Sequence, residues 1–369
     1  MRICILTQPL GANYGGILQA YALQKTLKDM GHEVTTLRFP PEVSWVPSGL
    51  RKHLLTARRF VSKYVKGNRD IAFCNPDKQT RFAYKELNRF LDEQMQCLPA
   101  KAPLSQQDLP AFDAYIVGSD QVWRPAYSPC LSNFYLDFLG DAPVKRIAYA
   151  ASFGVDTWEA DKAMTARIRP LAQRFDAISV REASGVALCD QYLGVQALVM
   201  PDPSLLLPAS AYLDLCQPYH QQEAPFIAAY VLDKGEAESR FLHRMSEKTG
   251  LPVKYIGLLD WAKSTDALES WLDDIAQAGY VVTNSFHGTV FSILFEKEFI
   301  PIINRARGAS RFESLLSTMG LQDRLLALED LEQCGFDFPA IDYKPIRAKL
   351  QDIRSKGITF LTDSLSTQI

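Results

Sequence analysis

The sequence predicts an α/β protein of two domains, each with a parallel sheet covered by helices. The chain has 369 residues, and typical domains hold roughly 100 to 200 residues. Short apolar runs alternate with stretches of helical spacing over most of this length, which is typical of parallel strands joined by helices. The alternation stops in a proline-containing segment at residues 200–208 and starts again at Phe226. We therefore expect domains at residues 1–205 and 206–342.

The first domain opens with a strand, a loop, a helix and a second strand. Residues 3–7 are apolar, residues 11–16 form a loop containing glycine, residues 17–30 have helical spacing, and residues 33–39 are β-branched and apolar. Further short apolar runs predict strands at residues 114–117, 147–150, 177–180 and 197–200. Helical stretches separate these runs, so the parallel pattern continues through the domain.

Residues 41–110 interrupt this pattern, and we expect a helical insertion there. Residues 50–69 contain seven Lys or Arg and no acidic residue, with apolar side chains on one helical face. This pattern fits a helix on an anionic membrane surface. It also fits a helix that packs on its own domain while its cations are solvated.

The second domain is expected to contain strands at residues 226–232, 253–256, 280–283 and 299–303. Residues 343–369 have helical spacing and are too few to form a domain. We expect them to form a C-terminal helix that packs back across both domains.

Composition excludes several classes of protein. With 40 basic and 42 acidic residues the formal net charge is −2, so no general attraction for nucleic acid is expected. The seven cysteines form no CxxC pair and no zinc-finger spacing, so no metal site is expected. The chain shows neither a signal-peptide core nor a run of about 18 apolar residues, which predicts a cytoplasmic protein that could still contact a membrane surface.

Two candidate loops follow strands of the first domain, where the carboxyl ends of parallel strands present ligand-binding groups. Asn13, Gly15 and Gly16 precede the first helix, but the loop lacks the GxGxxG pattern, so it is either a tight turn or a ligand loop. The second loop contains the segment Gly118 to Trp123. In it, Ser119 and Asp120 follow a strand, and Asp120 is either a helix N-cap or a site carboxylate. Trp123 is either a core residue or a platform for a sugar.

The second domain contributes the sharpest signal. Asn284, Ser285 and His287 lie where an apolar strand runs into a helix, so His287 is expected at a helix N-terminus, where the dipole favours bound anions. His287 is therefore a candidate acid or base, although a lone His is usually structural. After the next strand come three cations that could bind phosphate or carboxylate or simply be solvated: Arg305, Arg307 and Arg311.

Five segments of the chain resemble the polysaccharide pyruvyl transferase family. They are NYGGILQAYAL at residues 13–23, GSDQVW at 118–123, ISVRE at 178–182, MPDPSLLL at 200–207 and NSFHGTVFS at 284–292. The resemblance implies two Rossmann-like domains in a GT-B-like arrangement, with the active site in the cleft between them. It also implies transfer of the enolpyruvyl group of phosphoenolpyruvate to a sugar as a ketal, with release of phosphate and without a cofactor.

The resemblance also implies roles for individual residues. His287 matches the active-site histidine of the family, and Asp120 matches an acidic residue of the N-terminal domain. Arg305 and Arg307 lie where the family places cationic phosphate ligands, and Arg181 matches the arginine after the fourth strand. The sequence departs from the family at Ser285, where many members carry an arginine.

Two other functions remain open at this point. A GT-B glycosyltransferase using a nucleotide sugar would need groups for the base and ribose, and a non-catalytic sugar-binding component of polysaccharide assembly would lack turnover. The pyruvyl transferase interpretation predicts phosphoenolpyruvate as donor and a galactose of a lipid-linked or polymeric surface polysaccharide as acceptor. It predicts no nucleic acid partner, and it allows peripheral contact with the inner face of the cytoplasmic membrane.

Overall fold

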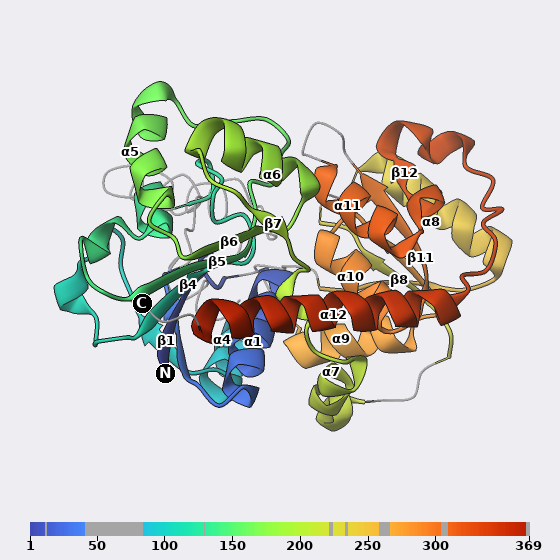
Figure 1. Cartoon of the computed structure of the whole chain (residues 1–369). Coiled ribbons are helices and arrows are strands. Elements are labelled where there is room, and N and C mark those ends of the chain that lie inside the picture. The colour runs from blue at the N-terminus through green and yellow to red at the C-terminus, as the bar shows by residue number, and fades with distance from the viewer. Residues whose placement is uncertain are drawn as a thin grey trace, which may run out of the picture.

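The computed structural model describes residues 1–11, 13–40, 84–128, 130–220, 224–232, 235–257, 266–303 and 309–366. These residues form two domains, each built on its own parallel sheet (Figure 1). The basic segment at residues 50–69 lies outside the described residues, so its helix stays a prediction. No described helix is both long enough and apolar enough to cross a membrane.

The first domain contains a seven-stranded sheet in the order β3–β2–β1–β4–β5–β6–β7, with every pair of neighbours parallel. All residues of the central strands β4 and β5 are buried, as expected for a sheet covered on both faces. The strands are β1 (Arg2–Leu6), β2 (Glu33–Arg38), β3 (Cys97–Pro99), β4 (Ala114–Val117), β5 (Lys145–Ala151), β6 (Ala177–Val180) and β7 (Leu198–Val199). The main helices are α1 (Tyr14–Asp29), α4 (Lys85–Gln94), α5 (Lys162–Ala172) and α6 (Ala183–Leu188).

The second domain contains a five-stranded parallel sheet in the order β12–β11–β10–β8–β9. Its strands are β8 (Ile227–Tyr230), β9 (Val253–Tyr255), β10 (Tyr280–Thr283), β11 (Glu298–Ile303) and β12 (Leu326–Ala327). Its helices are α7 (Ala209–Cys216), α8 (Glu236–Thr249), α9 (Leu268–Gln277), α10 (Phe286–Leu294) and α11 (Ser310–Met319). The expected boundary after residue 205 falls between β7 and β8.

The C-terminal helix α12 (Tyr343–Ser366) runs along both domains (Figure 1). Its first half packs through Ile346 and Leu350 into the core that contains α10 and α11. Its second half packs through Phe360 and Leu361 beneath the first sheet. Gly357 permits close contact here, since a Cβ atom at this position would lie 2.6 Å from Leu206 Cδ2. The helix thus ties the two domains together.

The two domains also contact each other directly beside the first helix. The Tyr14 ring of α1 stacks on Trp271 of α9 with centroids 5.5 Å apart, and its hydroxyl donates to the Asp266 carbonyl at 2.8 Å. Arg89 of α4 donates to both carboxylate oxygens of Glu269 at 2.8 Å. These contacts fix the position of the α1 N-terminus against the second domain.

The predicted fold class is confirmed: two Rossmann-like domains with parallel sheets in a GT-B-like arrangement. Two short edge strands, β3 and β12, were not expected, and β7 is shorter than its apolar run. The described part of the insertion is also not purely helical, because it contains both α4 and β3. Strands of two or three residues give no recognisable periodicity in a sequence, which explains why they were missed.

Candidate active site

The candidate site lies where the carboxyl ends of the two sheets approach each other. Both sheets contribute, since polar side chains follow β4, β6, β7, β10 and β11, and the α1 N-terminus follows β1. Such an edge is the usual ligand-binding edge of an open parallel sheet. The side chains that the chain brings together there are Asp120, Arg181, Asp202, His287 and Arg311.

Arg181 is the centre of the cluster. Its Nη1 donates to Asp202 Oδ2 at 2.7 Å, and its Nη2 donates to Asp120 Oδ1 at 3.2 Å. Its side chain is only 2% exposed, and its Nε has no hydrogen-bond partner among the described residues. Buried charges are stable only when paired, so Arg181 and the two carboxylates hold one another in place. One N–H group of Arg181 is left over for a ligand.

Both carboxyl groups are held in the charged form. Burial raises the pKa of Asp202, but His287 and Arg181 lower it by more, so the pKa lies well below its usual value. For Asp120, burial raises the pKa, while Arg181, His287 and Arg311 lower it to a value below the usual one. Neither group is therefore suited to donate a proton near neutral pH. Both are suited to stabilise a positive charge beside them.

His287 lies in the first turn of α10, as predicted. The Ser285 side chain caps this helix by accepting from the Gly288 N–H at 3.4 Å. His287 Nε2 lies 3.5 Å from Asp202 Oδ2 and has no other polar partner among the described residues. The Nε2 atom is therefore not committed to a strong hydrogen bond and is available to a ligand in the site.

The imidazole of His287 packs directly against the backbone at the start of α1. A Cβ atom at Gly15 would lie 2.1 Å from both Cγ and Nδ1 of the ring, a distance that no side chain can accept. Gly15 is therefore required to let the two domains bring His287 to the α1 N-terminus. The exposed Asn13 caps α1 through Gly16 N at 3.1 Å and directs its Nδ2 toward Asp120 Oδ2 at 3.5 Å.

Arg311 and Arg181 lie on the same aromatic ring. The Phe286 ring centroid is 4.7 Å from the guanidinium carbon of Arg181 and 5.8 Å from that of Arg311. Within the described part of the chain Arg311 forms no ion pair, and its buried Nε has no hydrogen-bond partner. Burial, reinforced by the like charge of Arg181, lowers the pKa of Arg311 to about 10.

The N-terminus of α11 completes an anion-binding geometry beside Arg311. The helix begins at Ser310, no side chain caps it, and the buried Ser310 hydroxyl has no partner among the described residues. Free N–H groups at a helix start favour anions, and arginine binds phosphate and carboxylate through two N–H groups at once. A small polyanion would thus satisfy several groups that are otherwise unpartnered.

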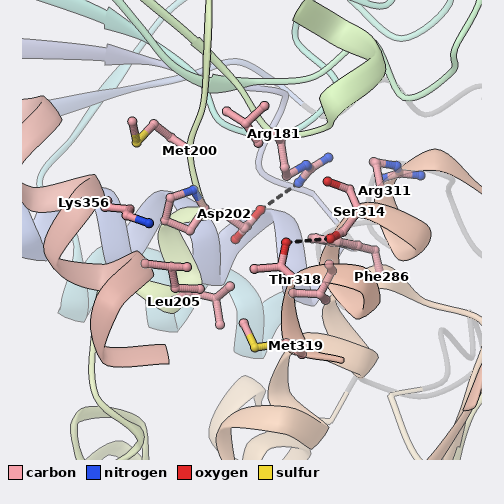
Figure 2. Close-up of a pocket in the computed structure, with 14 residues that line it drawn as sticks. Arg181, Met200, Asp202, Leu205, Phe286, Arg311, Ser314, Thr318, Met319 and Lys356 are labelled. Atoms are coloured by element: carbon pink, nitrogen blue, oxygen red, sulfur yellow. Dashed lines mark hydrogen bonds and ion pairs between the residues drawn. The ribbon is translucent and has the colours of Figure 1, made fainter. Parts of the chain in front are cut away.

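A cavity of about 210 Å³ adjoins the cluster (Figure 2). Figure 2 shows Arg181, Arg311 and Phe286 on one side of it, and Lys356 of α12 on another. A single water needs only about 10 to 15 Å³ of such space, so the cavity is large enough for a small molecule. Much of its remaining wall is apolar, formed by Val199, Met200, Pro201, Leu205, Leu315, Met319 and Ile353.

Most of the predicted site residues that the structure describes lie in or beside this cluster. Asn284 stands next to it and accepts a hydrogen bond from Leu232 N at 2.8 Å, so it fixes the loop after β8. Asp120 has φ of 65° and starts no helix, which excludes the N-cap alternative. Arg305 and Arg307 lie outside the described residues, and their roles stay predictions.

Two predicted substrate contacts are not supported by the structure. Ser119 is fully buried, and its hydroxyl donates to the Ala150 carbonyl at 2.8 Å. Trp123 is 1% exposed, stacks on Tyr135 with centroids 5.1 Å apart and donates to the Phe134 carbonyl at 3.0 Å. Both side chains are used within the core, so neither can contact a ligand.

Asp202 and Phe286 were not predicted as site residues. Asp202 lies between two prolines, three residues after the end of β7, and it was visible within the segment MPDPSLLL. Phe286 resembles any core aromatic in a helix, and no sequence signal identifies it. Among the described residues no group of His, Cys, Asp and Glu is arranged to hold a metal ion.

A family model described as polysaccharide pyruvyl transferase matches residues 13–305. No curated protein sequence matches the chain at a significant level.

Several solved structures are similar in overall shape at low identity. UDP-GlcNAc 2-epimerase from Neisseria meningitidis bound to UDP-GlcNAc has 8% identity and a TM-score of 0.49, covering 99% of each chain. UDP-GlcNAc 2-epimerase from Methanocaldococcus jannaschii has 9% identity and a TM-score of 0.46, covering 96% of this chain and 99% of the other. UGT89C1 of Arabidopsis thaliana complexed with UDP has 13% identity and a TM-score of 0.45, covering 97% of this chain and 94% of the other.

Proposed function

Because the chain belongs to the polysaccharide pyruvyl transferase family, we propose that it transfers the enolpyruvyl group of phosphoenolpyruvate to a sugar, forming a ketal and releasing phosphate. One observation carries the choice of donor. Two guanidinium groups, that of the buried Arg181 and that of the half-buried Arg311, share the Phe286 ring beside a histidine whose Nε2 lies next to a carboxylate. Phosphoenolpyruvate supplies a phosphate and a carboxylate for the cations and a double bond for the acid.

Donor binding is assigned to the arginines and to the start of α11. Arg181 and Arg311 both pack on the Phe286 ring, and each has a side-chain N–H group without a partner among the described residues. One small polyanion bound beside this ring would contact both. The Asp120 and Asp202 carboxylates more than offset the charge of Arg181, so Arg311, which forms no ion pair among the described residues, is the cation left to bind the donor. Arg305 and Arg307 precede α11 in the sequence and would add to this charge.

Protonation of the donor is assigned to His287. The imidazolium gives its Nε2 proton to the methylene carbon of phosphoenolpyruvate, and the first acceptor hydroxyl oxygen bonds to the adjacent carbon. The neutral imidazole then takes the proton of that hydroxyl, which restores the starting charge. Asp202 at 3.5 Å stabilises the imidazolium at both stages.

The second step closes the ketal. A second hydroxyl of the same sugar bonds to the former C2 carbon, the carbon–oxygen bond to phosphate breaks, and the hydroxyl proton leaves with the phosphate. Preorganised cations around the leaving phosphate lower the barrier because they are already in place when charge develops on it. Neither step requires a metal or another cofactor, and we propose that the enzyme uses none.

The acceptor is proposed to be a galactose, joined through its 4- and 6-hydroxyls, in a lipid-linked or polymeric surface polysaccharide. The enzyme would then work at the inner face of the cytoplasmic membrane, with residues 50–69 providing salt-sensitive contact through several cations worth on the order of 1 kcal/mol each. Sedimentation with anionic liposomes at low salt tests this contact. Replacement of Arg51, Lys52, Arg58 and Arg59 by Glu should weaken it, and equal sedimentation of both proteins would contradict it.

The experiment that tests the activity measures phosphate released from phosphoenolpyruvate with simple galactosides and lipid-linked oligosaccharides, without added divalent metal. Mass spectrometry should show an acceptor heavier by one pyruvate less one water. Turnover that requires a nucleotide sugar and ignores phosphoenolpyruvate would instead identify a glycosyltransferase. Binding of sugar without any turnover would identify a non-catalytic component.

A further inference from the structure

The loop that follows Asp120 carries an unusually exposed aromatic ring. Tyr127 is 53% exposed, the largest exposed fraction among the described Phe, Tyr and Trp residues. The loop is nevertheless firmly anchored, because Ser128 Oγ donates to the Val122 carbonyl at 2.7 Å. Gln8 Nε2 donates to the Gln121 carbonyl at 2.6 Å and to Ser128 Oγ at 3.1 Å. The ring is therefore held outward on a fixed segment.

The Arg124 side chain packs on this ring, and two further polar side chains hold Arg124 in place. The Arg124 guanidinium carbon lies 4.7 Å from the Tyr127 centroid, a cation–π contact that orients the ring. Arg124 is itself held by both carboxylate oxygens of Glu159 at 3.0 Å and by Gln121 Oε1 at 3.1 Å. We name Tyr127, Arg124, Glu159, Gln121 and Gln8 the Tyr127 shelf.

The Tyr127 shelf adjoins the donor cluster. Gln121 directly follows Asp120, and Gln8 lies two residues after the end of β1, so both belong to the same sheet edge as the cluster. The positive charge of Arg124 is among those that lower the pKa of Arg311, which places the shelf within electrostatic reach of the donor cations. A molecule resting on the shelf would thus lie near a donor bound by Arg311.

The chemistry of the shelf matches a sugar ring. A pyranose presents one face of C–H groups, which pack on the negative face of an aromatic ring, and a rim of hydroxyls, which bond to amide, carboxylate and guanidinium groups. We propose that the Tyr127 shelf is the subsite for the pyranose of the acceptor; this assignment of its occupant rests on the transferase function proposed above. The Tyr127 shelf takes the role of sugar platform, which the sequence left open for Trp123.

Direct binding tests the shelf without donor chemistry. Titration calorimetry and saturation-transfer NMR would use the methyl glycosides of galactose, glucose, mannose and N-acetylglucosamine. We expect at least one glycoside to bind wild type, with Kd raised roughly 3- to 10-fold by Tyr127→Ala and little changed by Tyr127→Phe. The matched control is Tyr280→Ala. Tyr280 is the first residue of β10, at the end of the strand away from the site, so this variant should bind the glycosides as wild type does.

Steady-state kinetics supplies a second readout. With phosphoenolpyruvate as donor, Tyr127→Ala should raise the KM for the acceptor by a similar factor and leave the KM for the donor unchanged. Failure of all four glycosides to bind, an unchanged Kd in Tyr127→Ala, or equal changes in both KM values would overturn the proposal. Glycoside binding through Tyr127 with no phosphate release would leave the shelf intact and refute the pyruvyl transfer instead.

Discussion

Replacing Arg311 with methionine should stabilise the free protein and abolish donor binding. Methionine keeps the length and apolar contact of the side chain with Phe286 but removes a buried charge that has no ion pair among the described residues. The pKa of Arg311 is lowered from 12.5 to about 10, which means that the folded state disfavours the charged form. At about 1.4 kcal/mol per pKa unit, the charge costs the folded state on the order of 3 kcal/mol.

A bound donor should reverse this cost. At a concentration of 100 times its Kd, a ligand that binds only the folded state adds about 2.7 kcal/mol to the stability. Wild type should therefore gain roughly that amount from phosphoenolpyruvate, and Arg311→Met should gain almost none. For domains of this size each kcal/mol moves the unfolding midpoint by about 2 to 4 °C, so both effects are measurable in a thermal scan.

The assay is thermal unfolding of both proteins with and without phosphoenolpyruvate, with Arg167→Met as matched control. Arg167 pairs with Asp137 on the surface, and exposed ion pairs contribute only about 0 to 1 kcal/mol. The control should therefore unfold close to wild type and gain the full donor effect. A lower midpoint for free Arg311→Met, together with a donor gain equal to that of wild type, would refute the assignment of Arg311 as an anion ligand.

Three further predictions concern the histidine and its neighbours. His287→Gln should lower kcat at least about 100-fold with little change in the unfolding midpoint, because a positioned acid or base contributes that much; near-normal turnover of the folded variant would make His287 structural. Gly15→Ala should lower kcat and the midpoint together, since its Cβ would lie 2.1 Å from the imidazole. Gly31→Ala is the control for kcat: its Cβ would meet no atom within 4 Å, but its φ of +89° is strained for alanine, so the midpoint should fall while kcat stays near wild type. Asp202→Asn should be less stable than wild type by about 3 to 5 kcal/mol near pH 7, since it leaves Arg181 incompletely paired. The pKa of Asp202 is lowered in the folded state, so its contribution to the free energy of unfolding is complete above the unfolded pKa of about 3.9 and is lost as the pH falls further. The difference in free energy of unfolding between wild type and Asp202→Asn should therefore shrink below about pH 4. A difference that stays constant down to about pH 2 would contradict the ion pair.

The sequence was sufficient for the parts of the fold that carry a periodic pattern. The apolar strands β4, β6 and β10 were placed at their observed bounds and α1 within three residues, because buried parallel strands are short apolar runs and the helix shows helical spacing of its apolar residues. His287 was placed correctly at a helix N-terminus for the same reason, since an apolar strand runs directly into the helix that carries it.

Which side chains of a loop face a ligand could not be predicted. Trp123 and Tyr127 lie four residues apart in one irregular segment, and only the packing of Trp123 on Tyr135 shows which of them is buried. Ser119 was similarly misassigned, because the partner of its hydroxyl, the Ala150 carbonyl, lies on a different strand. Asp202 acquires its role through Arg181 and His287, which the chain brings to it from two other strand ends. Such long-range pairings leave no local signal.

The most direct test of the proposed activity is the coupled measurement of phosphate release and product mass with phosphoenolpyruvate and a galactoside acceptor. The proposal predicts phosphate release that depends on the acceptor, and one molecule of acceptor converted to its pyruvate ketal for each phosphate released. It predicts that His287→Gln, folded as wild type, loses both products together. Phosphate release without ketal, ketal formation undiminished in His287→Gln, or no consumption of phosphoenolpyruvate with any sugar acceptor would contradict it.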